Sequence, residues 1–125
     1  MIRWGLVGLG RAGIARRRVL LERDDCRLVV QSSRRDSNTP TFEELLKCDV
    51  DAIALCRESL SHAADALAGL NAGKHVLLEY PLAMTGREAQ DIVSSSLKVG
   101  RMVHVGHLAM LSPFHDDVVK AIRDI

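Results

Sequence analysis

The fold is decided by the first segment of the chain, Ile2-Arg3-Trp4-Gly5-Leu6-Val7-Gly8-Leu9-Gly10-Arg11-Ala12-Gly13. Residues 2–7 are apolar enough for a buried strand, and residues 11–22 carry apolar side chains at helical spacing. The glycines between them follow the pattern G-x-G-x-x-G, which is specific only where a strand precedes it and a helix follows. This context predicts a tight turn and a helix whose free N–H groups can bind a pyrophosphate.

Each glycine of this turn has its own expected role. Gly8 permits the tight bend, Gly10 lets the backbone approach a pyrophosphate, and Gly13 allows the helix to pack closely on the strand. Arg11 and Ala12 belong to the first helical turn beside the phosphates, where Arg11 either adds a charged contact or stays solvated. The alternative interpretation is an incidental glycine-rich turn that binds nothing.

The rest of the chain alternates short apolar runs with longer helical patterns. Strands are expected at residues 27–32, 50–56, 75–79 and 102–106, and helices at 41–47, 61–71, 85–99 and from 113 to the end. Such alternation predicts an α/β fold: a Rossmann-like, doubly wound parallel sheet in three α/β/α layers, forming one domain over residues 1–125. The last helix has an apolar face (Phe114, Val118, Ala121, Ile122 and Ile125), which we expect the sheet to cover.

Composition excludes several classes of function. The net charge of the 125 residues is +1, which gives no reason to expect nucleic acid or an anionic membrane as a partner. No apolar run approaches the roughly 18 residues of a membrane span, and the N-terminus lacks the pattern of a signal peptide, so we expect a cytoplasmic protein. The three cysteines form no metal-ligand pattern, so no metal is expected.

The end of the second strand indicates which nicotinamide cofactor is preferred. A domain specific for NAD places an acidic residue about 20 residues after the glycines, where it binds the ribose 2′-hydroxyl. Here the stretch reads Gln31-Ser32-Ser33-Arg34-Arg35, and the first carboxylate is Asp36. Two guanidinium groups and a serine hydroxyl suit a 2′-phosphate. We therefore predict NADPH, with NADH as the weaker alternative if Asp36 takes the ribose.

Polar residues also follow the third, fourth and fifth strands, where ligands of open α/β sheets bind. Cys56, Glu58, Ser59 and His62 come after the third strand, although His62 can instead make a structural hydrogen bond. Ser61 is placed to cap the next helix. The fourth strand ends in Glu79-Tyr80-Pro81, and His107 follows the fifth. A plain packed tyrosine is the alternative for Tyr80.

Four stretches together resemble the biliverdin reductases of the wider glucose–fructose oxidoreductase and inositol dehydrogenase family (Gfo/Idh/MocA). They are Gly8 to Gly13, Ser33-Arg34-Arg35, the segment from Cys56 to His62, and the segment from Asn71 to Pro81. Most relatives that oxidise sugars carry Glu-Lys-Pro where this chain has Glu79-Tyr80-Pro81. Tyr80 therefore points away from sugar oxidation and toward reduction of a linear tetrapyrrole.

The resemblance implies hydride transfer from NADPH to biliverdin, giving bilirubin. By motif, the glycines hold the pyrophosphate; Ser33, Arg34 and Arg35 hold the 2′-phosphate; and Cys56, Glu58, Ser59, His62, Glu79 and Tyr80 complete the cofactor site. Tyr80, Glu79 and His107 are the catalytic candidates. The alternatives are a sugar or polyol dehydrogenase and a non-catalytic NADP(H)-binding module.

The C-terminal α/β domain of the family is absent from these 125 residues. We therefore expect either a segment of a longer protein or a short form that completes its substrate site as a homo-oligomer.

Overall fold

A computed structural model describes all residues 1–125 and contains one five-stranded sheet. The strands are β1 (Ile2–Val7), β2 (Cys26–Ser32), β3 (Ala52–Leu55), β4 (His75–Glu79) and β5 (Val103–Gly106). The helices are α1 (Arg11–Glu22), α2 (Phe42–Leu46), α3 (His62–Asn71), α4 (Gly86–Val99) and α5 (Pro113–Arg123), with short 3₁₀ helices η1 (Ser59–Ser61) and η2 (Leu108–Leu111). All strand pairs are parallel, in the order β2-β1-β3-β4-β5. The predicted doubly wound fold is confirmed.

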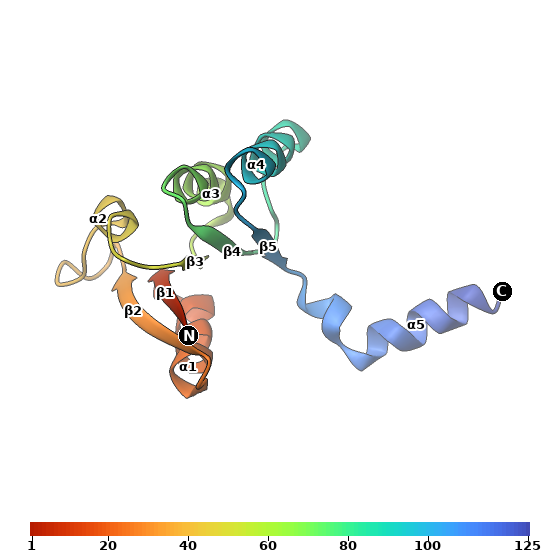
Figure 1. The fold of residues 1–125 in the computed structure, drawn as a ribbon. Coiled ribbons are helices and arrows are strands. Elements are labelled where there is room, and N and C mark those ends of the chain that lie inside the picture. Colours follow the sequence, from red (N-terminus) through yellow and green to blue (C-terminus); the bar gives the residue numbers. More distant parts are fainter.

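The sheet lies between two layers of helices. α1 lies on one face, and α2, α3 and α4 lie on the other, as Figure 1 shows. This arrangement follows from right-handed crossovers that run in opposite directions along the sheet, from β1 to β2 one way and from β2 onward the other way. The first crossover leads to β2 at one edge, and the later ones lead through β3 toward β5 at the other edge.

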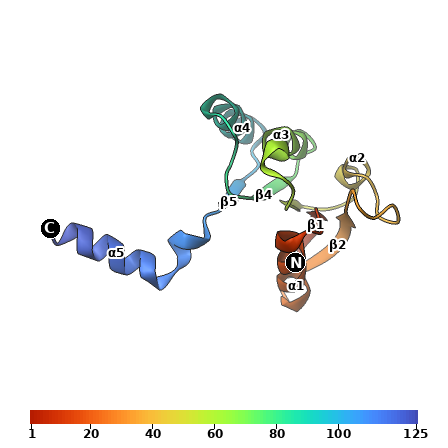
Figure 2. The same ribbon diagram turned by 180° about the vertical axis from the view of Figure 1, so that it is seen from behind.

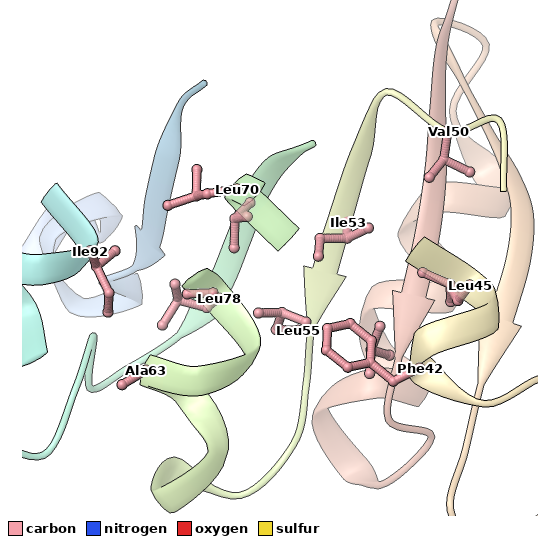
Figure 3. Close-up of a cluster of buried hydrophobic side chains, with 12 residues drawn as sticks. Phe42, Leu45, Val50, Ile53, Leu55, Ala63, Leu70, Leu78 and Ile92 are labelled. Atoms are coloured by element: carbon pink, nitrogen blue, oxygen red, sulfur yellow. The ribbon is translucent and has the colours of Figure 1, made fainter. Parts of the chain in front are cut away.

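The hydrophobic core lies mainly under α2, α3 and α4. Figure 3 shows Leu45 and Leu70 directed from these helices toward Ile53, Leu55 and Leu78 of the sheet. These five side chains are at most 1% exposed. Burial of one such aliphatic side chain contributes about 1.5–3 kcal/mol, so this layer fixes the positions of the strand ends.

Local signals in the sequence set where several helices begin and end. Thr41 and Thr85 each accept a hydrogen bond from the backbone N–H three residues later, and Glu44 and Glu88 bond back to complete two capping boxes. α4 ends at Gly100, which has a positive φ of 64°. Ser61 does not cap α3, contrary to expectation, because its hydroxyl donates to Glu58 instead.

The C-terminal helix departs from the prediction. Figures 1 and 2 show that α5 extends away from the sheet rather than across it. Its apolar side chains are consequently exposed, with Phe114 at 74% and Ile122 at 65%. The expectation that the sheet covers this helix is wrong, because η2 directs the chain away from the sheet after β5. No helix is long and apolar enough to cross a membrane.

Candidate functional site

A cleft of about 880 Å³ opens at the carboxyl ends of β1, β2 and β3. Its walls come from the turn after β1, from residues 32–43 except Asn38, and from residues 56–58 after β3. This is the switch point of the sheet, where the crossovers from β1 and β3 leave on opposite faces and their loops part. The topology thus brings together three segments that are far apart in the sequence.

The glycine turn has the geometry expected of a phosphate-binding loop. Gly8 has a φ of 92°, and its N–H donates to the carbonyl of Ser32 at 2.8 Å. A Cβ on Gly13 would lie 1.8 Å from the carbonyl oxygen of Gly8, so α1 packs directly on the turn. A Cβ on Gly10 would meet nothing within 4 Å. The backbone of Gly10 is therefore open to a ligand, whereas Gly8 and Gly13 are required by the turn itself.

The N-terminus of α1 suits an anion. Arg11 and Ala12 are exposed in its first turn, which contains no acidic residue. The Gly10 N-cap has no side chain to bond the first N–H groups. Those free N–H groups and the positive end of the helix dipole provide the chemistry that binds a diphosphate. The residues present therefore fit the pyrophosphate of a dinucleotide.

The loop after β2 is held by side chain to backbone hydrogen bonds. The hydroxyl of Thr39 donates to the carbonyl of Asp36 at 2.8 Å and accepts from the N–H of Ser33 at 2.9 Å. The Ser33 hydroxyl accepts from the N–H of Arg35 at 3.3 Å. Arg34 and Arg35 are exposed at the wall of the cleft. The loop therefore presents two guanidinium groups from a restrained backbone.

Arg34 already has an anionic partner in the cleft. Its Nη1 donates to Oε1 of Glu58 at 2.6 Å, and the hydroxyl of Ser61 donates to the same oxygen at 2.9 Å. A hydrogen bond from its own backbone N–H, then Ser61 and Arg34, lower the pKa of Glu58 to about 2. Glu58 is therefore a carboxylate at every physiological pH.

Arg57 is a cleft residue that the sequence did not single out. Its guanidinium lies 5.4 Å from the ring centroid of Phe42, and its Nη1 donates to Oδ2 of Asp65 at 3.0 Å. Both charged side chains are only about a tenth exposed. Burial raises the pKa of Asp65 above its usual value, although Arg57 opposes that shift. The ion pair of Arg57 and Asp65 connects the loop after β3 to α3.

A second group of residues gathers where β3, β4 and β5 end. Nε of Arg16 donates to Oε1 of Glu79 at 2.7 Å, with both side chains about three-quarters buried. A Cβ on Gly106 would lie 3.1 Å from both of these side chains. Burial, together with the charge of Glu79, raises the pKa of Cys56 to about 11. Arg16 reaches Glu79 because it follows Gly13 by about one helical turn and so lies on the face of α1 that packs on the sheet.

Tyr80 and His107 lie side by side although 27 positions separate them in the sequence. Their ring centroids are 5.4 Å apart in an edge-to-face arrangement. Tyr80 is 69% exposed, so it is not the plain packed tyrosine of the alternative interpretation. The pair arises because β4 and β5 are neighbours and both residues follow the ends of these strands.

His62, the first residue of α3, is directed into the protein. It is 1% exposed, its Nδ1 lies 2.6 Å from the carbonyl of Pro81, and its Nε2 lies 3.1 Å from the carbonyl of Arg57. Both ring nitrogens are thus occupied by backbone, which leaves none for a cofactor. The geometry corrects the prediction of a cofactor contact in favour of the structural alternative.

The structure therefore divides the predicted site residues into two groups. Gly8, Gly10, Ser33, Arg34, Arg35, Cys56 and Glu58 line the cleft. The predicted residues outside its lining are Arg11, Ala12, Gly13, Ser59, His62, Glu79, Tyr80 and His107. Cys56 lies between the cleft and the second group, because the charge of Glu79 acts on its thiol. Thr39 and Phe42 also line the cleft. Thr39 is placed by the hydrogen bonds of the loop after β2, and Phe42 by the capping box that starts α2.

A dinucleotide cleft at the switch point of a parallel sheet is typical of the nucleotide-binding domains of oxidoreductases. Residues 2–107 match the Gfo/Idh/MocA family, described as an oxidoreductase family with an NAD-binding Rossmann fold. The chain belongs to this family and comprises its NAD(P)-binding domain.

Individual relatives include several kinds of oxidoreductase. The chain is 34% identical over 116 residues to biliverdin reductase A of Mus musculus, a match covering 85% of this chain and 39% of that protein. It is 40% identical over 81 residues to 4-carboxy-2-hydroxymuconate-6-semialdehyde dehydrogenase of Sphingobium sp., covering 65% of this chain and 26% of the enzyme.

A solved structure is similar over nearly the whole chain. The biliverdin reductase of Synechocystis sp. PCC 6803, in complex with biliverdin and NADP⁺, superposes with a TM-score of 0.87 at 27% identity. The match covers 97% of this chain and 42% of that protein. The chain therefore spans about two-fifths or less of the length of these relatives.

Proposed function

We propose that this chain is the NADPH-binding domain of a reductase that acts on a linear tetrapyrrole of the biliverdin type. The observation that carries the proposal is the wall of the cleft formed by Ser33, Arg34 and Arg35. A wall of this kind favours a cofactor with a 2′-phosphate, because guanidinium groups bind phosphate oxygens through charge-assisted hydrogen bonds.

The preference for NADPH over NADH depends on the missing acid at the end of β2. Asp36, the first carboxylate after that strand, accepts a hydrogen bond at 3.0 Å from the backbone N–H of Asn38. That bond engages Asp36 in the local turn and leaves Arg34 and Arg35 as the charged groups nearest the strand end. NADH remains the weaker ligand in this proposal.

The choice of a tetrapyrrole over a sugar rests on Tyr80. A sugar dehydrogenase of this family needs a lysine beside the nicotinamide, and Lys74, which precedes β4, is at the wrong end of that strand. Nζ of Lys74 donates to the carbonyls of Cys48 and Val50 at 3.0 Å each, below the amino end of the sheet. Similarity to biliverdin reductases over 85% and 97% of the chain supports the same choice.

In this proposal, the role of each residue follows from its position in the site. The glycine turn and the N-terminus of α1 bind the diphosphate, and Arg34 and Arg35 bind the 2′-phosphate. NADPH supplies a hydride to the methine carbon of the substrate when it is bound. Glu79, held by Arg16, borders the nicotinamide end, and Tyr80 or a water that it orients delivers the proton. His107, in contact with Tyr80, is the alternative donor.

The first experiment measures binding and turnover separately. NADPH is titrated into the protein and followed by its fluorescence; biliverdin is then added and the absorption of bilirubin is recorded. Binding with bilirubin formation supports the proposal. NADPH binding without turnover favours a non-catalytic module. Turnover of a sugar or polyol with NADP⁺, but not of biliverdin, contradicts the substrate and favours the sugar dehydrogenase.

A further inference from the structure

One negative charge lies in a wall otherwise suited to a phosphate. The carboxylate of Glu58 is bonded to Arg34 at 2.6 Å and is held in that place by the hydroxyl of Ser61 at 2.9 Å. The other two carboxylates of the cleft, Asp36 and Glu43, belong to no ion pair. Glu58 is thus the one acidic group of the cleft that occupies an arginine expected to bind the cofactor.

We propose that Glu58 is a specificity-determining residue: it occupies Arg34 in the free protein and must release this guanidinium when a 2′-phosphate enters the cleft. The inference rests on the proposed function, because it requires a nicotinamide dinucleotide in this cleft. Its consequence is that Glu58 weakens the binding of NADPH and leaves that of NADH almost unchanged. Glu58 therefore narrows the difference in affinity between the two cofactors.

The competition follows from the charges of the two anions. A phosphate monoester carries between one and two negative charges and three acceptor oxygens at neutral pH, whereas a carboxylate carries one charge and two oxygens. The phosphate therefore displaces Glu58 from Arg34. Ser61 still keeps the released carboxylate nearby, where it repels the phosphate. NADH has a neutral 2′-hydroxyl and leaves the ion pair intact.

The test measures dissociation constants of NADPH and NADH for the unaltered chain and for Glu58→Gln. The substitution keeps the shape of the side chain and removes its charge. Because exposed ion pairs contribute little, we expect NADPH to bind about two- to fivefold more tightly, and NADH to bind as before. Glu43→Gln is the matched control, because it removes the same charge from the same cleft but breaks no ion pair with Arg34. It should increase the affinity for NADPH less than Glu58→Gln does.

A double-mutant cycle separates competition for Arg34 from simple repulsion. In the Arg34→Ala background, Glu58→Gln should improve NADPH binding no more than Glu43→Gln does. Unchanged circular dichroism and melting temperature show that each variant is folded. Equal effects on NADPH and NADH, a loss of NADPH affinity, or a full gain retained without Arg34 would each overturn the inference. No NADPH binding by the unaltered chain would instead contradict the proposed function.

Discussion

Replacing Arg34 by alanine tests the phosphate assignment most directly. A charge-assisted hydrogen bond to a phosphate contributes about 1.5–3 kcal/mol. Arg34 must first break its ion pair with Glu58. The two side chains are 65% and 55% exposed, so the loss of this pair offsets only up to about 0.5 kcal/mol of the gain from the phosphate. The remaining 1–2.5 kcal/mol corresponds to a roughly 5- to 70-fold weaker binding of NADPH. NADH affinity should change less than about twofold, because no phosphate is lost.

The assay is a titration of both cofactors by calorimetry at one fixed ionic strength, since salt screens exposed charges. Arg87→Ala is the control, because it removes the same charge from an exposed position of α4 outside the cleft. It should leave both affinities unchanged. Equal weakening of NADPH and NADH by Arg34→Ala would refute the assignment, as would no weakening of either.

Three further predictions follow from other parts of the site. Gly13→Ala should lower the free energy of unfolding by about 1–3 kcal/mol, because its Cβ would lie 1.8 Å from the Gly8 oxygen. Gly10→Ala should keep the melting temperature and weaken nucleotide binding, because a Cβ there meets no protein atom. The opposite pattern would contradict the roles of the two glycines. With a pKa raised to about 11 from 9.0, the thiol of Cys56 should react with iodoacetamide at pH 7.5 about a hundredfold more slowly than in the unfolded chain, because its thiolate fraction is that much lower. The rate should rise as the pH passes through 9 toward 11, and a fast reaction at pH 7.5, read by mass spectrometry in a variant that lacks Cys26 and Cys48, would contradict the burial. If the proposed reaction takes place, Tyr80→Phe should slow bilirubin formation modestly. A loss of NADPH affinity instead would show that Tyr80 serves cofactor binding.

The ion pair of Arg16 and Glu79 and the ring contact of Tyr80 and His107 show how the second group of residues is built. Each pair joins elements that are distant in the sequence: α1 with the end of β4, and the end of β4 with the residue after β5. Gly106 leaves room for the first pair, because any Cβ there would crowd both side chains. The ends of neighbouring parallel strands thus bring the proposed catalytic residues together, beside the cleft in which we propose that the cofactor phosphates bind.

The sequence by itself determined the features that depend on local interactions. The glycine turn, the two capping boxes and the proline that starts α5 each fix backbone geometry within a few residues, so the order of strands and helices could be predicted. Arg34 could be assigned to the cleft because the loop after the second strand of this fold lies beside the switch point, within reach of the ribose of a bound dinucleotide. These inferences use only the spacing of apolar residues along the chain and the residue types in the turns. They need no information about residues that are distant in the sequence.

Only the tertiary structure decided which side chains meet across the sheet. Arg34 and Glu58 are 24 residues apart in sequence, and Arg16 and Glu79 are 63 apart. Whether such side chains meet depends on their rotamers and on how the strands are ordered in the sheet. The burial of His62 and the exposure of α5 likewise depend on what covers each surface once the chain has folded. An amphipathic pattern states that a face is apolar, but the packing of the remaining elements determines whether anything lies against it.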